Sequence, residues 1–512
     1  MENRFINIFP RVFMKNFQHL QNLKNLLPTF LNILGNKQNL LLTEIADKKP
    51  YLTDQRNRYN GNALAVIFPE NKEQIIEIIK LCQQHNIKII PQGGNTSLCG
   101  AATPDSAENN VLINLAKMNQ ILAVNADNFT LTAQAGATLS EIQQAAERQN
   151  RLFPLSLASE GSCQIGGNLS TNAGGIHVLN YGMMRDLCLG LEVVLPNGEI
   201  FNHLLGLRKD NSGYALQQLF IGAEGTLGII TAATLRLFAL PKDTYTIWLD
   251  VANLPTAISI LNLMRNAFDF NLSAFEVINK NALLKVKNNI SDIQIPEEFS
   301  NKKTENSWKI LADINIFENA VNEFNNAENI EQWLYKNLYE NANTNANFDI
   351  LNIVIPQNKL QQQQLWKIRK SISEAQKKSG ISLKHDISLP IDVIPDFIKL
   401  CGQQLNSHFP DINIVTFGHL GDGNLHYNLS FDDEVKQQNL LLPENQQLAH
   451  NIVHNLVNEF NGSISAEHGI GQFKINELTK YKSQVELNLM KQIKKVFDPN
   501  NIMNPNKIFI SD

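Results

Sequence analysis

Hydrophobic and polar positions follow a regular order in the first part of the chain. Apolar runs at residues 63–68 and 87–90 predict two strands, and apolar positions at helical spacing over 71–84 predict a helix between them. This order is typical of a βαβ-like opening. A later apolar run at 228–237 predicts another strand, and Pro241, which follows it, marks a domain boundary.

A different kind of sequence follows this boundary. From residue 244 onward glycine becomes scarce while Asn, Gln and Lys become frequent, and residues 256–268 and 359–378 have helical periods. The composition therefore predicts a second domain. The expected division is a helical N-terminal segment at 1–50, a first domain at 51–241, a second at 242–455 and a C-terminal segment at 456–512.

One short segment, GHLGDGNLHYN at residues 418–428, carries a strong hairpin signal in its Asp-Gly pair at 422–423. If this pair forms a two-residue turn, His419 lies directly opposite His426, and Asn428 shares their face of the sheet. Directly opposed side chains have Cβ atoms roughly 4.5–5.5 Å apart, a separation that lets two imidazoles share a metal ion. The alternative is a surface turn in which the histidines are not ligands.

Composition and charge restrict the classes of function. The 512 residues are 43% hydrophobic and 18% charged, which predicts a globular protein of two or three domains. A net charge of -5 offers no basic excess for nucleic acid. The five cysteines show no CxxC spacing, so we expect neither a disulfide framework nor a thiolate zinc site, and a reducing compartment such as the cytoplasm.

The chain offers no apolar run long enough to span a bilayer, so any membrane contact is expected to be peripheral. The basic and apolar residues 1–36 are interpreted as a docking helix or an over-long gene start. The alternatives are an amphipathic surface-binding segment or a transit-like peptide.

Two glycine-rich segments, PQGGNTSLCG at 91–100 and EGSCQIGGNLSTNAGG at 160–175, point to a bound phosphate group. Both combine Gly with Ser, Thr and Asn, so backbone N–H groups and hydroxyls can converge on a pyrophosphate. Neither contains GxGxxG or GxxxxGK[ST], which disfavours Rossmann and P-loop sites. The alternative is that they are turns of a β-rich domain.

Four segments resemble, in order, the FAD-contacting segments of the vanillyl-alcohol oxidase type flavoproteins: PQGGNTSLCG, GSCQIGGNLSTNAGG, YGMMRDLCLGLEVVLPNGE and FIGAEGTLGIIT. GHLGDGNLHYN, SAEHGIG and FDPNNIMNP are similar to the C-terminal half of the D-2-hydroxyacid dehydrogenase branch. LWKIRKSIS followed by LKHDISLP resembles the D-2-hydroxyglutarate dehydrogenases within that branch. The resemblance runs from about residue 51 to residue 509.

This resemblance implies an α+β fold. The first domain would be a two-subdomain FAD-binding domain of the PCMH type, followed by an antiparallel-sheet cap or substrate domain and a helical C-terminal segment packing by the flavin. The residues implied to hold FAD are Gln92, Gly93, Gly94, Asn95, Thr96, Ser97, Gly161, Ser162, Gly166, Gly167, Thr171, Asn172, Gly174, Gly175 and Ile229.

The resemblance also implies a metal site. His419, His426 and Glu467 would bind one divalent ion, zinc or another metal, and two imidazoles with one carboxylate leave coordination positions open to substrate. The adjacent His468 would bind substrate and accept its proton as hydride leaves C2 for flavin N5.

An anion-binding set is implied on the other side of the substrate. Arg369 and Ser373 lie four residues apart on a predicted helix and therefore on one face, and Lys384 follows in the next segment. Arg369 can bind a carboxylate through two hydrogen bonds, Lys384 adds a point charge, and Asn428 adds a hydrogen bond.

The activity implied is FAD- and zinc-dependent oxidation of D-2-hydroxyglutarate to 2-oxoglutarate. The alternatives are a D-lactate or glycolate dehydrogenase of the same fold, or a non-catalytic flavin- or metal-binding subunit. An electron-transfer flavoprotein or a quinone is the implied acceptor, contact with the inner membrane would be peripheral, and a homodimer is the suggested assembly.

Three further histidines receive structural interpretations. His177 follows the glycine run and is expected to pack rather than to attach flavin. His450 and His454 lie at i and i+4 on a predicted helix and could chelate a metal, but no HExxH glutamate lies between them, so a helix surface is expected.

Overall fold

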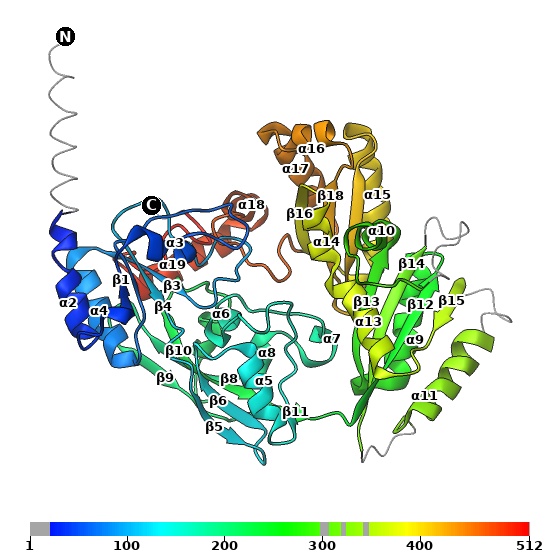
Figure 1. The fold of residues 1–512 in the computed structure, drawn as a ribbon, viewed down its shortest axis with the longest axis horizontal. Coiled ribbons are helices and arrows are strands. Elements are labelled where there is room, and N and C mark those ends of the chain that lie inside the picture. Colours follow the sequence, from blue (N-terminus) through cyan, green and yellow to red (C-terminus); the bar gives the residue numbers. More distant parts are fainter. Residues whose placement is uncertain (1–20, 297–306, 319–323, 341–347, 511–512) are drawn as a thin grey trace, which may run out of the picture.

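The computed structural model describes residues 21–296, 307–318, 324–340 and 348–510, which form two lobes (Figure 1). Residues 1–20 of the predicted N-terminal segment lie outside this described part. The remainder of that segment belongs to the first lobe, where Phe30 is fully buried in the main core. Its elements are α2 (Leu27–Ile33), β1 (Leu41–Leu42) and α3 (Ile45–Leu52).

The first sheet of this lobe confirms the predicted strand–helix–strand opening. Strands β2 and β3 both pair parallel to β4, which lies between them, and β1 adds an antiparallel edge. Helix α4 connects β2 to β3 and buries Ile75, Ile78 and Ile79. The elements are β2 (Ala65–Ile67), α4 (Lys72–His85), β3 (Lys88–Gln92) and β4 (Asn110–Asn114).

A second sheet in the same lobe is entirely antiparallel, in the order β5-β6-β10-β8-β9. The predicted strand at 228–237 is confirmed as β10. The strands are β5 (Ile121–Asn125), β6 (Thr130–Gln134), β8 (Cys188–Val194), β9 (Ile200–His203) and β10 (Ile229–Arg236), with the short pair β7 (Arg151–Leu152) and β11 (Phe238–Ala239). The helices are α5 (Leu139–Glu147), α6 (Ile165–Ser170), α7 (Val178–Tyr181) and α8 (Met184–Leu187).

The second lobe is built on a seven-stranded antiparallel sheet, as expected for the cap domain. Its order is β15-β12-β14-β13-β17-β18-β16, and separate apolar clusters cover its two faces, so its strands are buried on both sides. The strands are β12 (Asp243–Val251), β13 (Leu272–Asn279), β14 (Trp308–Ile316), β15 (Ile350–Val354), β16 (Ser382–Ser388), β17 (Asn413–His419) and β18 (Asn424–Ser430).

Helices pack on both faces of this sheet (Figure 1). They are α9 (Leu254–Phe268), α10 (Lys280–Asn289), α11 (Ala327–Leu334), α13 (Lys359–Lys370), α14 (Ile372–Lys378), α15 (Ile394–His408), α16 (Glu434–Leu440) and α17 (Pro443–Glu459). A single helix was expected over 359–378, but the structure has two: α13 ends at Lys370 and α14 begins at Ile372, with Ser371 between them.

After α17 the chain returns to the first lobe, where α18 (Ile475–Tyr481) and α19 (Gln484–Phe497) lie (red in Figure 1). Met503 forms a bridge with Ile89 of β3, and Lys494 Nζ donates a hydrogen bond to the Thr226 carbonyl at 2.8 Å. The segment that connects the two lobes carries Glu467 and His468. It therefore brings these residues to the boundary between the lobes.

Two other expectations can be compared with the structure. All five cysteines lie in the described part of the chain, and each is free, in agreement with the expectation of no disulfide framework; all five are also buried. None of the described helices is long and apolar enough to cross a bilayer.

The expectation that His450 and His454 lie on a helix surface is wrong, since both are buried. Helix α17 packs against both α15 and β16. These two contacts bury a wide face of the helix, which includes His450 and His454.

Candidate active site

The hairpin that carries His419 and His426 differs from its predicted register. Four residues, 420–423, connect β17 to β18, so His419 lies opposite Asn424 and His426 opposite Phe417. A two-residue type I′ turn needs positive φ at both central residues, but only Gly423 has it, at 80°. The register shift is two residues, and side chains alternate with period two, so the two histidines still share a face.

The two imidazoles lie with ring centroids 5.9 Å apart. His419 is almost fully buried, and Glu276 on the neighbouring strand β13 pairs with it in register. The Glu276 carboxylate binds His419 Nδ1 through one oxygen and accepts a hydrogen bond from Arg369 Nε at 2.5 Å through the other. This carboxylate therefore fixes the orientation of both side chains.

These contacts set the charges of the pair. Burial alone would raise the pKa of Glu276, but Arg369 and His419 together lower it to about 2. Burial would lower the pKa of His419, but Glu276 raises it to about 9. With Nδ1 turned to Glu276, Nε2 of His419 lies 3.7 Å from Glu467 Oε1. A cation that binds at Nε2 must therefore displace a proton.

Asp386 of β16 organises the other half of the site. It pairs in register with His426, whose Nδ1 lies 3.7 Å from Asp386 Oδ1. Its Oδ2 accepts hydrogen bonds from the backbone amides of Glu467 and His468, both at 2.9 Å. Burial would raise the pKa of Asp386, but His468, Lys474 and His426 hold it well below its usual range. The carboxylate therefore ties the connecting segment to the cap sheet in its ionised form.

The predicted metal ligands come together. His419, His426 and Glu467 each offer one ligand atom, and these atoms lie within 4.8 Å of one another. Two imidazole nitrogens and one carboxylate oxygen fit a borderline divalent ion such as zinc and leave positions open. Asp386, His426 and His468 also lie close enough to form a set, but Asp386 Oδ2 is already occupied by two amides.

His468 stacks on His426, with ring centroids 5.9 Å apart and planes 19° apart. Burial lowers the pKa of His468 to about 4, although Asp386 opposes the shift. The ring is thus neutral at neutral pH and can accept a proton. Because Nδ1 faces Asp386 Oδ2 at 3.6 Å, Nε2 is the ring nitrogen that does not face this carboxylate, and His468 lines the cavity between the two lobes.

A cavity of about 800 Å³ lies between the lobes and is lined by both glycine-rich segments and by this cluster. Its size is within the usual range for ligand and cofactor sites. Of the predicted FAD residues, those that line it are Gln92, Gly93, Gly94, Asn95, Thr96, Ser97, Gly166, Gly167, Thr171, Gly174, Gly175 and Ile229. The other three, Gly161, Ser162 and Asn172, are not among the lining residues.

The cradle fits a polar cofactor that approaches the backbone closely. A Cβ added to Gly94 would lie 1.9 Å from the Ser162 carbonyl oxygen, so the two glycine-rich segments pack directly on each other there. Among described residues, the buried Ser97 Oγ and Gln164 Oε1 have no hydrogen-bond partner. Buried polar atoms are normally satisfied, so these atoms are available to a ligand such as FAD.

The cavity wall opposite the glycine-rich segments is cationic. Arg369, Ser373 and Lys384 all line it, although Arg369 and Ser373 lie on different helices rather than on one. Burial and the nearby Arg56 and Arg58 lower the pKa of Lys384 to about 8. The basic lining residues that sequence reasoning missed are Arg56, Arg58, Lys370 and Lys377.

Asn428 is the predicted substrate residue that the structure does not bring to the cavity. Its Nδ2 donates to Gln376 Oε1 at 3.0 Å, and its Oδ1 accepts from the His385 amide at 3.3 Å. His177 is likewise not among the lining residues, and its Nδ1 lies 2.9 Å from the Pro154 carbonyl with its ring edge-on to Tyr181.

Glu276 and Asp386 were both missed by sequence reasoning, although each carries a signal. Glu276 interrupts the apolar run Leu272–Asn279, and a charged residue in a buried strand needs a partner. Asp386 stands in LKHDISLP, two residues after Lys384 and therefore on the same face of its strand. Neither partner is near in sequence, so the pairing itself could not be predicted.

The sequence of the chain matches known protein families and known proteins. Residues 63–203 match the FAD binding domain, and residues 240–508 match the C-terminal domain of FAD linked oxidases. D-2-hydroxyglutarate dehydrogenase from Stutzerimonas stutzeri (strain A1501) is 35% identical over 479 residues, which cover 92% of this chain and 96% of that protein. The mitochondrial D-2-hydroxyglutarate dehydrogenase of Arabidopsis thaliana is 34% identical, covering 94% and 80%.

The fold has a counterpart among solved structures as well. Substrate-bound p-cresol methylhydroxylase superposes with a TM-score of 0.71 at 15% sequence identity, covering 96% of this chain and 97% of that chain. This likeness confirms the expected PCMH-type α+β fold. Matched in both halves and similar to these relatives over most of its length, the chain belongs to the FAD-linked oxidases, within the vanillyl-alcohol oxidase type flavoproteins.

Proposed function

We propose that the protein oxidises D-2-hydroxyglutarate to 2-oxoglutarate with FAD and a divalent metal ion, zinc in the first instance. One observation carries the proposal: the basic residues Arg369 and Lys384 line the same cavity as His468 and the predicted metal ligands, beside the glycine-rich cradle. The names of the relatives support D-2-hydroxyglutarate as the substrate.

The cationic wall suits a dicarboxylate. Arg369 uses Nε for Glu276, and its terminal nitrogens are left to bind a substrate carboxylate with two parallel hydrogen bonds. Its guanidinium also lies over Phe417 at 4.7 Å, which limits its movement. Lys384, with Arg56 and Arg58 close enough to depress its pKa, offers charge for a second carboxylate.

The proton and the hydride take separate routes. His468 Nε2 receives the proton of the 2-hydroxyl, and Asp386 stabilises the imidazolium that forms. The glycine-rich segments would hold FAD, which would supply the hydride-accepting chemistry opposite C2. His419, His426 and Glu467 would hold a divalent ion, which would supply Lewis acidity toward the hydroxyl. Arg369 and Lys384 orient the substrate for its oxidation to 2-oxoglutarate.

The remaining parts of the proposal concern its partners. An electron-transfer flavoprotein or a quinone would reoxidise the flavin, the protein would act as a cytoplasmic homodimer, and contact with a membrane would be peripheral. The family resemblance supports the acceptor and the homodimer, the cysteine pattern supports the compartment, and the lack of an apolar run long enough to span a bilayer supports peripheral contact.

A substrate panel with controlled metal content tests the proposal. Purified protein is treated with chelator, assayed with D-2-hydroxyglutarate, D-malate, D-lactate and glycolate under an artificial acceptor, and assayed again after Zn²⁺ is added. We expect turnover to be lost with the metal and restored by Zn²⁺ while flavin absorbance persists. A higher kcat/KM for D-lactate would favour a monocarboxylate dehydrogenase, and a protein without flavin bands would favour a non-catalytic subunit.

A further inference from the structure

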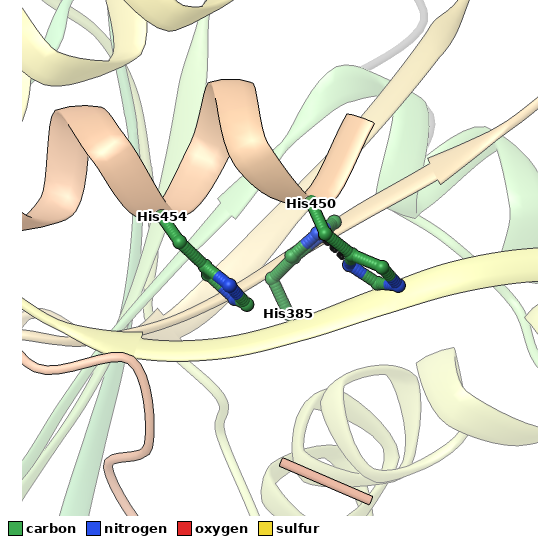
Figure 2. Close-up of side chains that lie close together, drawn as sticks. All are labelled: His385, His450 and His454. Atoms are coloured by element: carbon green, nitrogen blue, oxygen red, sulfur yellow. Dashed lines mark hydrogen bonds between the residues drawn. The ribbon is translucent and has the colours of Figure 1, made fainter. Parts of the chain in front are cut away.

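Three buried histidines form a cluster behind the active-site strand. His385 lies on β16, and His450 and His454 lie one turn apart on α17; Figure 2 shows the His385 side chain close to the two helical side chains. Their exposed fractions are 1%, 8% and 4%. One ring nitrogen of each lies within 4.8 Å of one from each of the others. This proximity is sufficient for all three rings to bind one ion.

The hydrogen bonds of His385 prepare one nitrogen for a metal. Its Nδ1 lies 2.9 Å from the Tyr427 carbonyl oxygen, and because a carbonyl only accepts, Nδ1 carries the hydrogen. Its Nε2 therefore carries the lone pair, which accepts a hydrogen bond from His450 Nδ1 at 2.8 Å (dashed in Figure 2). A metal ion at this nitrogen would replace that hydrogen bond. Metal-binding histidines are typically held by such a bond from the second ring nitrogen to a backbone carbonyl.

His454 supplies an independent indication of a missing ligand. Its Nδ1 is buried and has no hydrogen-bond partner in the part of the chain that the structure describes. Buried polar atoms in proteins are nearly always satisfied, so an unpartnered imidazole nitrogen beside two other histidines suggests an ion or another donor. The aromatic rings of Phe473 and Tyr481 lie beside His450 and His454, respectively.

All three rings have the protonation state that a metal requires. Burial lowers the pKa of His450 to about 4 and that of His454 to about 3, and Lys474 contributes to both shifts. Burial likewise holds the pKa of His385 far below its usual value. Lys474 is also the cation that would oppose a metal ion here, but its ammonium is bound to the Ile464 carbonyl at 2.8 Å.

We propose that His385, His450 and His454 form a second metal site, which holds a borderline divalent transition ion of the zinc class by three imidazole nitrogens and a water molecule. The site is separate from the cavity because His385 faces away from its neighbours Lys384 and Asp386 along the strand. The ion would join β16 to α17 and so hold the strand that carries Lys384, which lines the cavity, and Asp386, which binds the Glu467 and His468 amides.

Cobalt binding can count and locate the sites in the intact flavoprotein. Chelator-treated protein is titrated with Co²⁺, and bound cobalt is measured by equilibrium dialysis and by the d–d absorption beyond the flavin bands. We expect wild-type protein to bind two equivalents of cobalt, one at each site. His426→Ala should retain the equivalent bound by His385, His450 and His454. In His454→Gln the affinity for that equivalent should fall at least tenfold. Retained flavin content shows that each variant is folded.

The control is His408→Gln, which changes an exposed histidine on α15 and should leave both equivalents in place. A milder variant, His454→Cys, offers a thiolate ligand and should restore cobalt binding with a changed absorption spectrum. A wild-type protein whose only cobalt disappears in His426→Ala would overturn the second site. Two equivalents that both survive in His454→Gln would overturn it too, and neither result would affect the assignment of the first site.

Discussion

Asp386 holds His468 by two contacts: its Oδ2 accepts a hydrogen bond from the His468 amide at 2.9 Å and lies 3.6 Å from Nδ1 of the same residue. The strand of one lobe thus orients a residue on the segment that returns to the other lobe. The arrangement turns Nδ1 of the imidazole toward Asp386 and leaves Nε2 for the proposed substrate. It resembles other pairs in which a buried carboxylate supports a catalytic histidine.

The variant Asp386→Asn should test this support. An asparagine oxygen still accepts the amide hydrogen bonds but cannot stabilise an imidazolium, so we expect kcat to fall about 10–100-fold while the flavin stays bound. Steady-state kinetics across pH and the flavin absorbance give both readouts. Unchanged kcat would contradict a role for Asp386 in proton transfer.

Removal of the Glu276 charge should destabilise the cap lobe. Glu276→Gln leaves the buried Arg369 and His419 without their shared carboxylate, which should cost about 3–5 kcal/mol of unfolding free energy. The control Glu374→Gln breaks only the exposed ion pair with Lys378 and should cost less than about 1 kcal/mol. Denaturant titration measures the unfolding free energy of both variants. An equal loss of unfolding free energy in the two variants would show that burial of Glu276, Arg369 and His419 adds nothing to their interaction.

Glu276 also predicts how stability depends on acidity. Its folded pKa of about 2 lies below its ordinary value, so its ionised form stabilises the folded state. This stabilisation is complete above the ordinary carboxyl pKa of about 4.3 and is lost as pH falls from there toward about 2. Melting temperatures of wild type and Glu276→Gln should therefore converge over that interval. Parallel curves would contradict the shifted pKa.

Lys384 should make substrate affinity fall at alkaline pH. Its pKa of about 8 means that the ammonium is charged at neutral pH and becomes neutral above that value. We expect KM for D-2-hydroxyglutarate to rise above pH 8, approaching about tenfold per pH unit. Lys384→Arg keeps its charge and should remove this rise. A rise that persists in Lys384→Arg would assign the titration to another group.

Arg56 should contribute to selection of a dicarboxylate. It lines the cavity close enough to Lys384 to lower that residue's pKa, and a charged hydrogen bond to a carboxylate is worth about 1.5–3 kcal/mol. Arg56→Met should therefore lower kcat/KM for D-2-hydroxyglutarate by about 10–100-fold and change that for D-lactate much less. Equal losses for both substrates would place Arg56 at the shared carboxylate.

The sequence alone determined the local elements and the ligand types. The strand–helix–strand opening, strand β10 and the glycine-rich cradle followed from periodicity and composition, because these depend on neighbouring residues. The hairpin placed His419 and His426 on one face even though its register was wrong, since a shift of two residues preserves the side-chain alternation.

The tertiary structure alone decided which distant groups meet. Glu276 contacts His419 across 143 residues, Asp386 binds the Glu467 amide across 81, and His450 approaches His385 across 65. Such partners depend on sheet order and helix packing, which no local pattern encodes. For the same reason His450 and His454, which were expected on a helix surface, are buried by helix packing. Asn428, which was expected to bind substrate, instead donates a hydrogen bond to Gln376.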